Sequence, residues 1–470
     1  MKPFTPRAYQ ALAQDFLAAN PRCSLWARMG MGKTPMTLTL LNTQYRYLGH
    51  TAPTLILGPL RVARDVWSDE VNKWEHLAGL EVSPIIGSAS ERMSALKRDV
   101  PIYTINYENL PWLREALGDR WPFETVVADE ARRLKGFRTR QGSSRAAALR
   151  DVAHTKVNQW INLTGAPAPN GLVDLWGQQW FVDKGARLGA TFTAFQNRWF
   201  NTIMLEGKGQ KLIPTPWAAE QIHGLLSDCS LTLDPKDWFD LKEPVMVTVP
   251  VTLPPKARAI YDQMEQEAVA EIRNVGHVRA MSAGSKSGKC LQLASGAVYT
   301  DPEDPNAWTS VHDEKLTALD SILSEANGAP VIVVYHWRHD LYKLQKAYPQ
   351  GVELATTEGL AKFKRGEAEI GFANAASIGH GVDGLQNVCS TMVYFSAWWD
   401  LDTYDQMLER IGPMRQHQAG KNVAVMVYNI VASDTMDEVV IEARSKKTTV
   451  QEALLRYMKH GKSTRGHSDL

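Results

Sequence analysis

Residues 25–34, Leu-Trp-Ala-Arg-Met-Gly-Met-Gly-Lys-Thr, have the pattern of a strand end, a glycine turn and a helix start. Gly30 and Gly32 let the backbone curl so that successive N–H groups point at one anion, and the helix beginning at Lys33 adds its positive N-terminal end. In loops of this kind the lysine bridges the β- and γ-phosphates, and a hydroxyl such as that of Thr34 ligates Mg²⁺. The stretch therefore predicts a site for ATP and Mg²⁺ on an α/β fold.

This phosphate-loop pattern departs from its general form at one position. Ala27 stands where G-x-x-x-x-G-K-[ST] has its first glycine, which gives the variant A-x-x-G-x-G-K-T used by many helicases. A Gly-Lys-Thr tripeptide alone would be an ordinary surface turn. The apolar residues before it and the helical run at 36–41 behind it favour a phosphate loop.

An acidic pair later in the chain fits the same chemistry. Asp129 and Glu130 end the apolar run Val126-Val127-Ala128, which puts them at the carboxyl edge of a parallel sheet, where open α/β folds bind ligands. Asp129 would hold Mg²⁺ through water, and Glu130 would orient and deprotonate the attacking water. An isolated Asp-Glu pair is usually solvated charge; the strand before it and the phosphate loop upstream favour catalysis here.

Length and composition describe an ordinary globular chain. Its 470 residues suffice for about three domain-sized units. No apolar run is long enough to span a membrane and the N-terminus lacks an apolar signal segment, so we expect a cytoplasmic protein, in the host cytoplasm if viral, without a membrane partner. The four cysteines form no C-x-x-C pair, which argues against zinc ribbons and disulfide frameworks. A net charge of +1 still permits nucleic-acid binding confined to one cleft.

Short apolar runs alternate with amphipathic ones from residue 53 to about 164, and again after residue 310. This rhythm predicts two α/β lobes, each a parallel sheet wrapped by helices, with helical insertions between them. We expect four ranges: lobe 1 with the ATP site over 1–170, a helical connector over 171–310, lobe 2 over 311–440 and a basic C-terminal tail over 441–470.

Three stretches outside the sheets carry expectations of their own. The Trp- and Phe-rich segment 172–231 has helical spacing, and we expect its aromatic side chains to be core rather than stacking platforms. Residues 255–272 have the pattern of a helix, and the small, polar stretch 282–289 that of a mobile loop. The tail from 441 is either a solvated basic face or a phosphate contact.

In its first part the chain resembles a superfamily 2 helicase of the SNF2 type, in the compact form associated with bacteriophage genomes. The resemblance covers nearly the whole length and implies two RecA-like lobes in tandem. The matching segments are Arg7–Gln10 for the adenine-reading Q motif, Gly58–Val62 with Arg61 for motif Ia, Asn106–Glu108 with Asn106 and Tyr107 for motif Ib, Asp129–Arg132 for the DEAH-like box with Arg in place of His, and Leu163–Pro167 followed by Asn170 for the L-T-G-T-P segment.

The second part resembles the same family in the same motif order. Tyr335–Arg338 stands at motif IV, Ser377–Gln386 resembles motif V with one residue more than G-x-G-L-N-L, and Trp398-Trp399 resembles the tryptophan-bearing segment before motif VI. Motif VI matches at Gln406 and Arg410. Its second arginine is expected where Pro413 stands, and Arg415 is displaced by two residues, so either arginine could reach the γ-phosphate.

The resemblance implies an ATP-dependent motor that couples ATP hydrolysis to movement on DNA, with ATP and Mg²⁺ as cofactors. We expect a monomer that binds duplex or branched DNA, with RNA left open. The alternative is an ATP-gated switch that binds DNA or a partner without translocation.

Roles follow for individual residues. The implied groups are catalytic Glu130, Arg410 and Arg415; nucleotide-binding Arg7, Gln10, Gly30, Gly32, Lys33, Thr34 and Gln406; metal-binding Thr34 and Asp129; coupling Thr164, Gly379 and Gly381; and nucleic-acid-binding Arg61, Asn106, Tyr107, Arg338 and Trp398. Taken singly, Gly379 and Gly381 could be a plain turn and Arg410 a surface ion pair.

Overall fold

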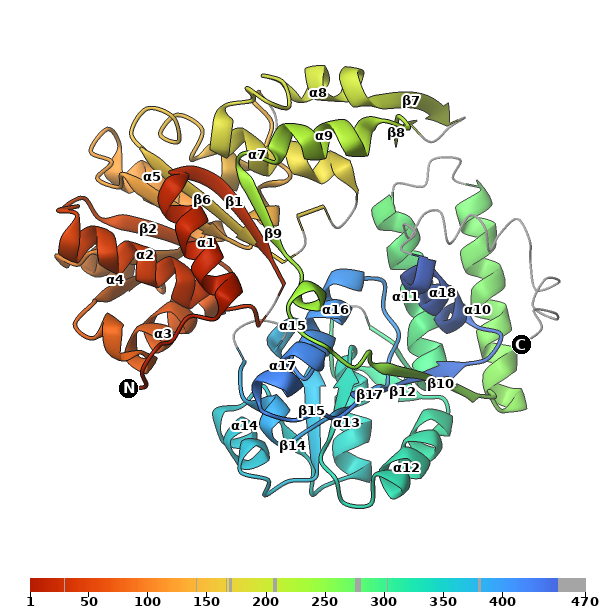
Figure 1. Cartoon of the computed structure of the whole chain (residues 1–470). Coiled ribbons are helices and arrows are strands. Elements are labelled where there is room, and N and C mark those ends of the chain that lie inside the picture. Colours follow the sequence, from red (N-terminus) through yellow and green to blue (C-terminus); the bar gives the residue numbers. More distant parts are fainter. Residues whose placement is uncertain are drawn as a thin grey trace. The chain divides into compact units, whose positions relative to one another are not determined.

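The computed structural model describes residues 1–28, 30–140, 142–165, 167–168, 171–205, 209–274, 280–301, 303–378 and 382–446. Internal contacts divide the chain into two compact units (Figure 1). Unit 1 comprises Met1–Ile203 with Gln210–Asp240, and unit 2 comprises Met204–Gly209 with Leu241–Leu470.

Unit 1 is built on a seven-stranded sheet in which every pair is parallel, in the order β3-β4-β2-β5-β6-β1-β9. Four of its strands, β2, β4, β5 and β6, confirm the apolar runs predicted from the sequence, and each is buried along its whole length. Continuous burial explains why they are apolar runs rather than alternating patterns. The bounds are β1 Arg22–Ala27, β2 Thr54–Gly58, β3 Val82–Ile85, β4 Ile102–Asn106, β5 Thr125–Asp129, β6 Gln159–Thr164 and β9 Ser230–Leu233.

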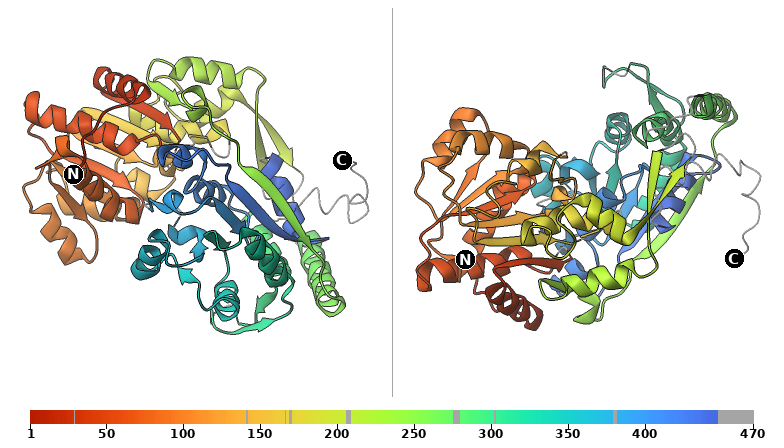
Figure 2. Two further views of the ribbon diagram at one scale, coloured as in Figure 1. Left: turned by 60° about the horizontal axis from the view of Figure 1, so that its bottom comes forward. Right: turned by 90° about the horizontal axis from the view of Figure 1, so that it is seen from above.

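Helices flank this sheet on both faces (Figure 2). The bounds are α1 Ala8–Ala19, α2 Lys33–Tyr47, α3 Trp67–Lys73, α4 Ala89–Leu96, α5 Leu110–Leu117, α6 Ser144–Ala147, α7 Leu175–Asp183, α8 Phe192–Trp199 and α9 Ala218–Leu226. The segment 172–231 supplies α7, α8 and α9, and its Trp176, Phe181, Phe195 and Trp199 are fully buried in the core of unit 1. The expectation that these aromatic side chains are core is confirmed for these four residues and is wrong for Trp217, which is 52% exposed.

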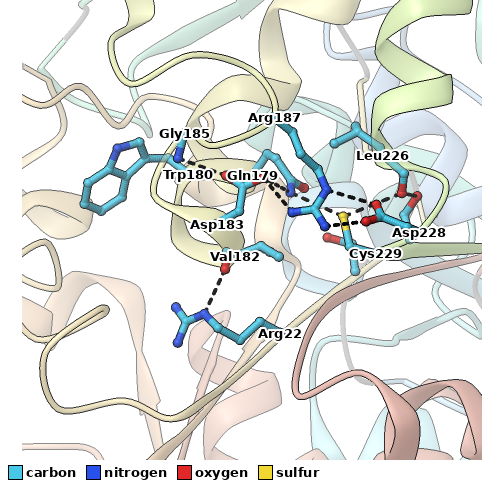
Figure 3. Close-up of polar contacts among 12 residues, drawn as sticks. Arg22, Gln179, Trp180, Val182, Asp183, Gly185, Arg187, Leu226, Asp228 and Cys229 are labelled. Atoms are coloured by element: carbon cyan, nitrogen blue, oxygen red, sulfur yellow. Dashed lines mark hydrogen bonds and ion pairs between the residues drawn. The ribbon is translucent and has the colours of Figure 1, made fainter.

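Strand β9, which the sequence reading missed, is fixed beside β1 by polar contacts (Figure 3). Arg187 donates to both oxygens of Asp228, at 2.9 and 2.6 Å, and to Asp183 at 3.2 Å. From β1 itself, Arg22 donates to the carbonyl of Val182 at the end of α7. These bonds tie the turn after α7 to the start of β9, so the sheet gains a strand beyond β1.

Unit 2 is built on a six-stranded sheet, again with only parallel pairs, in the order β10-β17-β16-β13-β15-β14. Strands β13, β15, β16 and β17 lie in the part after residue 310 where the sequence predicted a second set of apolar runs. The bounds are β10 Val245–Val251, β13 Val331–Tyr335, β14 Val352–Glu353, β15 Ile370–Asn374, β16 Thr391–Tyr394 and β17 Met426–Ala432. The two sheets confirm the predicted α/β class with two parallel-sheet lobes.

The helices of unit 2 include one that corrects an expectation. The bounds are α10 Pro255–Asn274, α11 Ala280–Ser295, α12 Glu314–Ala326, α13 Arg338–Ala347, α14 Thr357–Lys364, α15 Ala375–Ile378, α16 Leu401–Glu409, α17 Pro413–Gln418 and α18 Met436–Lys446. The helix predicted at 255–272 is α10. The loop predicted at 282–289 is wrong, because those residues lie in α11, which packs against α10 and α18. Packing of its buried Cys290 and Leu291 outweighs the weak helix propensity of its Gly and Ser residues.

Two further sheets have two strands each: β7 Phe200–Leu205 with β8 Gly209–Pro214, and the antiparallel pair β11 Ala297–Tyr299 with β12 Trp308–Ser310. All four cysteines are buried. In the part of the chain that the structure describes, no helix has both the length and the apolar character needed to cross a membrane. The basic tail beyond 446 and the motif V glycines 379 and 381 lie outside the described residues.

Candidate active site

The phosphate loop has the backbone that its glycines predict. Gly30 and Gly32 have φ angles of 83° and 82°, in the left-handed region that glycine tolerates, and α2 begins at Lys33 directly after them. The first N–H groups of a helix have no partner within it, so those of α2 are available to an anion at the loop. This geometry fits a bound phosphate.

The Q-motif residues lie against this loop. The side chain of Gln10 accepts a hydrogen bond from the backbone N–H of Arg7 at 2.9 Å and donates one to the Met31 carbonyl at 3.4 Å. A Cβ on Gly32 would meet Gln10 Nε2 at 2.5 Å, so the amide and the loop are in close contact. The structure thus brings Arg7 and Gln10 together with the phosphate loop, as the resemblance implies.

Lys33 folds back over the loop. Its ammonium donates to the carbonyl of Ala27 at 2.6 Å and approaches that of Arg28 at 3.4 Å. Phosphate oxygens would take over these bonds, since an ammonium has three donors and no acceptor. Thr34 follows in the first turn of α2.

Asp129 is the last residue of β5, and 8% of it is exposed. Burial, with the nearby charge of Glu130, raises the pKa of the Asp129 carboxyl to about 7, against the lowering effect of Lys33. A raised pKa shows that nearby positive charge does not offset the burial of this carboxylate, and a divalent cation bound there would supply that charge. Asp129 and Thr34 would hold Mg²⁺, which would neutralise phosphate charge.

Glu130 has a backbone conformation that few residues other than glycine adopt. Its φ and ψ are 57° and 51°, in the left-handed region, where a side chain costs conformational energy. Its carboxylate Oε2 lies 3.1 Å from Arg132 Nε. Strained positions of this kind cluster at active sites, which agrees with the role predicted for Glu130.

A pH-dependent stability follows from Asp129. The folded state keeps a proton on this carboxyl up to about pH 7, whereas the ordinary pKa is 3.8, so without Mg²⁺ the free energy of unfolding falls as the pH rises through this window. Asn has no such titration. We expect Asp129→Asn to melt roughly a few degrees higher than the wild type near pH 8, with the difference shrinking as the pH falls.

Differential scanning calorimetry of both proteins across this pH range makes the comparison. Mg²⁺ should raise the melting temperature of the wild type and leave that of the variant unchanged. A pH-independent difference between the two proteins would contradict the assignment.

Motifs Ia and Ib follow two neighbouring strands. Arg61 precedes a short π-helical turn, η1 (Val62–Val66), after β2, and Asn106 ends β4. Tyr107 is 1% exposed and donates its hydroxyl to the Asp129 carbonyl at 2.8 Å. The predicted contact of the Tyr107 side chain with nucleic acid is therefore corrected, because its ring is packed in the core.

Thr164 ends β6 and is fully buried. Of the segment that follows it, Pro167 is described and its carbonyl accepts a hydrogen bond from Gln178 of α7, whereas Ala166 and Asn170 lie outside the described residues. The coupling role of Thr164 stays a prediction.

In unit 2, Arg338 is the first residue of α13, directly past the carboxyl end of β13, and is exposed with its guanidinium 5.9 Å from the Tyr342 ring. Trp398 is 3% exposed; it stacks on His336 at 5.5 Å, and the Arg444 guanidinium lies 4.7 Å from its ring. Arg338 has a position suited to phosphate contact. The predicted contact of Trp398 with nucleic acid is corrected, since the indole is enclosed by these neighbours.

The arginines of motif VI lie on either side of a helix break. Helix α16 ends before Arg410, and α17 begins at Pro413, whose ring cannot continue the preceding helix. Arg410 is 4% exposed and donates to the Val382 carbonyl at 2.8 Å. Arg415 donates to Asp383 at 2.9 Å with 17% of its side chain exposed. Gln406 is buried in α16.

The sequence predicted no individual role for Arg132, Arg133 and Glu108, which form ion pairs in the structure. Arg132 pairs with Glu130, and Arg133 pairs with Glu108 at 3.4 Å. The replacement of the DEAH histidine by Arg132 was the available signal.

The chain is similar in sequence to one protein family and to individual proteins of known sequence. The SNF2-related domain family matches residues 18–281. Protein p41 of Acyrthosiphon pisum secondary endosymbiont phage 1 is 50% identical over 98% of this chain and 100% of its own length. An uncharacterised ATP-dependent helicase of Mycoplasma genitalium is 22% identical over 89% of this chain, which spans 39% of that helicase.

Among solved structures, the helicase domain of Hef from Pyrococcus furiosus matches with a TM-score of 0.51 at 13% identity, over 94% of this chain and 98% of that domain. This likeness supports the fold, with its two parallel sheets in tandem. The family match covers more than half of the chain, and the phage relative is matched along its full length. The chain therefore belongs to the SNF2-related family, as the motifs predicted.

Proposed function

We propose that the chain is an ATP-dependent nucleic-acid motor that couples ATP hydrolysis to movement on DNA. One observation carries the proposal: the phosphate loop after β1 and the Asp129–Glu130 pair after β5 follow parallel strands of one sheet, both next to β6. The Lys33 ammonium acts to lower the pKa of the Asp129 carboxyl, which agrees with a shared ligand. Ligands of open α/β sheets bind at this edge.

The residues divide the hydrolysis between them. The N–H groups of the loop and the Lys33 ammonium bind the phosphates, and Gln10 with Arg7 orients the adenine end. Glu130 accepts a proton from the attacking water, which its carboxylate holds in line with the γ-phosphate. Mg²⁺ would neutralise the developing phosphate charge.

DNA is the proposed partner. Arg61 and Arg338 follow strand ends, where their side chains could contact phosphate oxygens, whereas the predicted contact Asn106 ends β4 and is 6% exposed. No base-reading module is evident among the described residues. Contacts of this kind position a protein on nucleic acid without reading its sequence. The relative from Mycoplasma genitalium is described as an ATP-dependent helicase, which agrees with a motor. We propose a monomer in the cytoplasm.

An ATPase assay across single-stranded, duplex and forked DNA tests the proposal. Turnover stimulated by one or more of these DNAs supports the motor, and the preferred form identifies the substrate. Displacement of a triplex-forming strand from duplex DNA then reports translocation. Tight ATP binding without stimulated turnover would instead support the ATP-gated switch.

Binding to DNA is expected to weaken steeply with salt, although the chain carries a net charge of only +1. A protein that neutralises several phosphates has a slope of log affinity on log salt of about −0.9 for each duplex phosphate. Fluorescence anisotropy of a labelled duplex over a salt series measures the slope. Arg61→Ala and Arg338→Ala should each reduce it by about one phosphate, whereas a flat salt dependence would contradict phosphate-mediated binding.

A further inference from the structure

Two adjacent arginines follow the catalytic pair and reach different acidic partners. Arg132 and Arg133 both belong to η4 (Ala131–Leu134), a single 3-10 turn that begins directly after Glu130. Arg132 pairs back onto Glu130, whereas Arg133 pairs with Glu108, two residues past the end of β4. One short turn thus touches both the predicted base and the predicted nucleic-acid segment.

The pair of Arg132 with Glu130 is largely shielded from solvent. Arg132 Nε lies 3.1 Å from Glu130 Oε2, and the two side chains are 11% and 12% exposed. Ion pairs on the open surface are screened by water and weakly fixed, but shielding strengthens the attraction and limits the alternative rotamers. Arg132 therefore restricts where the Glu130 carboxylate can point.

Glu108 joins Arg133 to the end of β4. Its carboxylate accepts a hydrogen bond from Asn106 Nδ2 at 3.0 Å and pairs with Arg133 at 3.4 Å and with Arg145 of α6 at 3.0 Å. Burial works to raise the pKa of Glu108, but the Asn106 hydrogen bond and the two arginines bring it below its ordinary value. The carboxylate is therefore ionised at neutral pH and shared among three donors.

A second connection runs through the backbone. Tyr107, between Asn106 and Glu108, donates its buried hydroxyl to the carbonyl of Asp129, which belongs to the peptide group preceding Glu130. The strained, left-handed Glu130 is thus held from both sides, by Tyr107 at its backbone and by Arg132 at its carboxylate.

We infer that Arg132 is a positioning residue for Glu130, and that Arg133, through Glu108, makes this position depend on nucleic acid bound beside Glu108. The inference rests on the proposed function, which supplies both the hydrolysis and the nucleic-acid phosphate. Asn106 is only 6% exposed, whereas the side chains of Arg133 and Glu108 are 36% and 41% exposed, so a nucleic-acid phosphate reaches this pair from solvent and repels the Glu108 carboxylate. Glu108 then shifts toward Arg133, and the turn that carries Arg132 moves with it.

Steady-state ATPase kinetics of the full chain, with saturating duplex DNA and without DNA, test the inference. Arg132→Ala should lower the DNA-stimulated kcat by about tenfold or more, because a displaced Glu130 carboxylate accelerates proton transfer less. The KM for ATP should be unchanged. Arg132→Lys, which keeps the charge, should recover part of the loss. Arg133→Ala should bring the ratio of stimulated to basal kcat close to one, because the connection from Glu108 to the turn is lost.

Arg145→Ala is the matched control, because Arg145 also pairs with Glu108 but lies on α6, outside the turn. It should keep the stimulation ratio of the wild type. An unchanged kcat in Arg132→Ala, or equal losses of stimulation in Arg133→Ala and Arg145→Ala, would overturn the inference. A wild type without any ATPase activity would instead refute the proposed function, so the two failures are distinguishable.

Discussion

Lys33→Ala and Glu130→Gln should each abolish ATP turnover, for different reasons. Removal of the Lys33 ammonium takes away the charge that binds the phosphates, so we expect ATP affinity to fall by about ten- to a hundredfold. Glu130→Gln removes the base but keeps the size and shape of the side chain, so turnover should fall by about a hundred- to ten-thousandfold while ATP stays bound. Turnover and binding of a fluorescent ATP analogue separate the two effects.

Glu124→Gln is a matched control for the base, because Glu124 immediately precedes β5 and Glu130 immediately follows it. Glu124 pairs with Asn158 at the surface and should be dispensable. For the lysine, Lys73→Ala removes an ammonium paired with Glu70. A folded Lys33→Ala or Glu130→Gln protein with wild-type turnover would show that the site is elsewhere.

Arg415→Ala is expected to lower turnover at saturating ATP and DNA by about a thousandfold with little change in ATP affinity, because an arginine that stabilises the transferring phosphoryl group contributes about 10³ to 10⁵ in rate. We favour Arg415 over Arg410 for this role. Arg415 follows the helix break and donates to Asp383, a charged contact that a phosphate could replace.

Arg410→Ala should act mainly on stability. Its guanidinium is buried and bonded to the Val382 carbonyl, so truncation leaves a buried acceptor without this donor and opens a cavity. Thermal melts of Arg410→Ala, with Arg365→Ala as the control for an exposed arginine paired with Glu367, measure this effect. A larger loss of turnover in folded Arg410→Ala than in Arg415→Ala would reverse the assignment.

The sequence predicted the strands that are buried on both faces and missed those at the sheet edges. Strand β5 is a continuous apolar run because helices cover both of its faces. At the edges, β9 has four residues directly after a helix, and β10 alternates exposed residues with partly buried ones and contains Pro250. Proline is tolerated on an edge strand but argues against a strand when only the sequence is known.

Within the site, residue types and order predicted the phosphate loop, and the left-handed φ angles of Gly30 and Gly32 agree with the turn. Side-chain burial could not be predicted in the same way. Tyr107 and Trp398 match motif positions, yet a ring is either an exposed platform or core packing according to neighbours distant in sequence. The ion pair of Arg132 with Glu130 could not be predicted either, because it depends on the 3-10 turn that brings these two residues into contact.

The position of β9 at the edge of the first sheet affects folding during synthesis and the choice of fragments for expression. The strand leading into the phosphate loop, β1, gains its outer neighbour only when Ser230–Leu233 has left the ribosome, long after β6. A nascent chain, or a fragment cut at residue 170, would expose one side of β1 as a row of unpaired N–H and C=O groups, a template for aggregation. A fragment meant to preserve the nucleotide site should therefore extend to Asp240, where unit 1 ends.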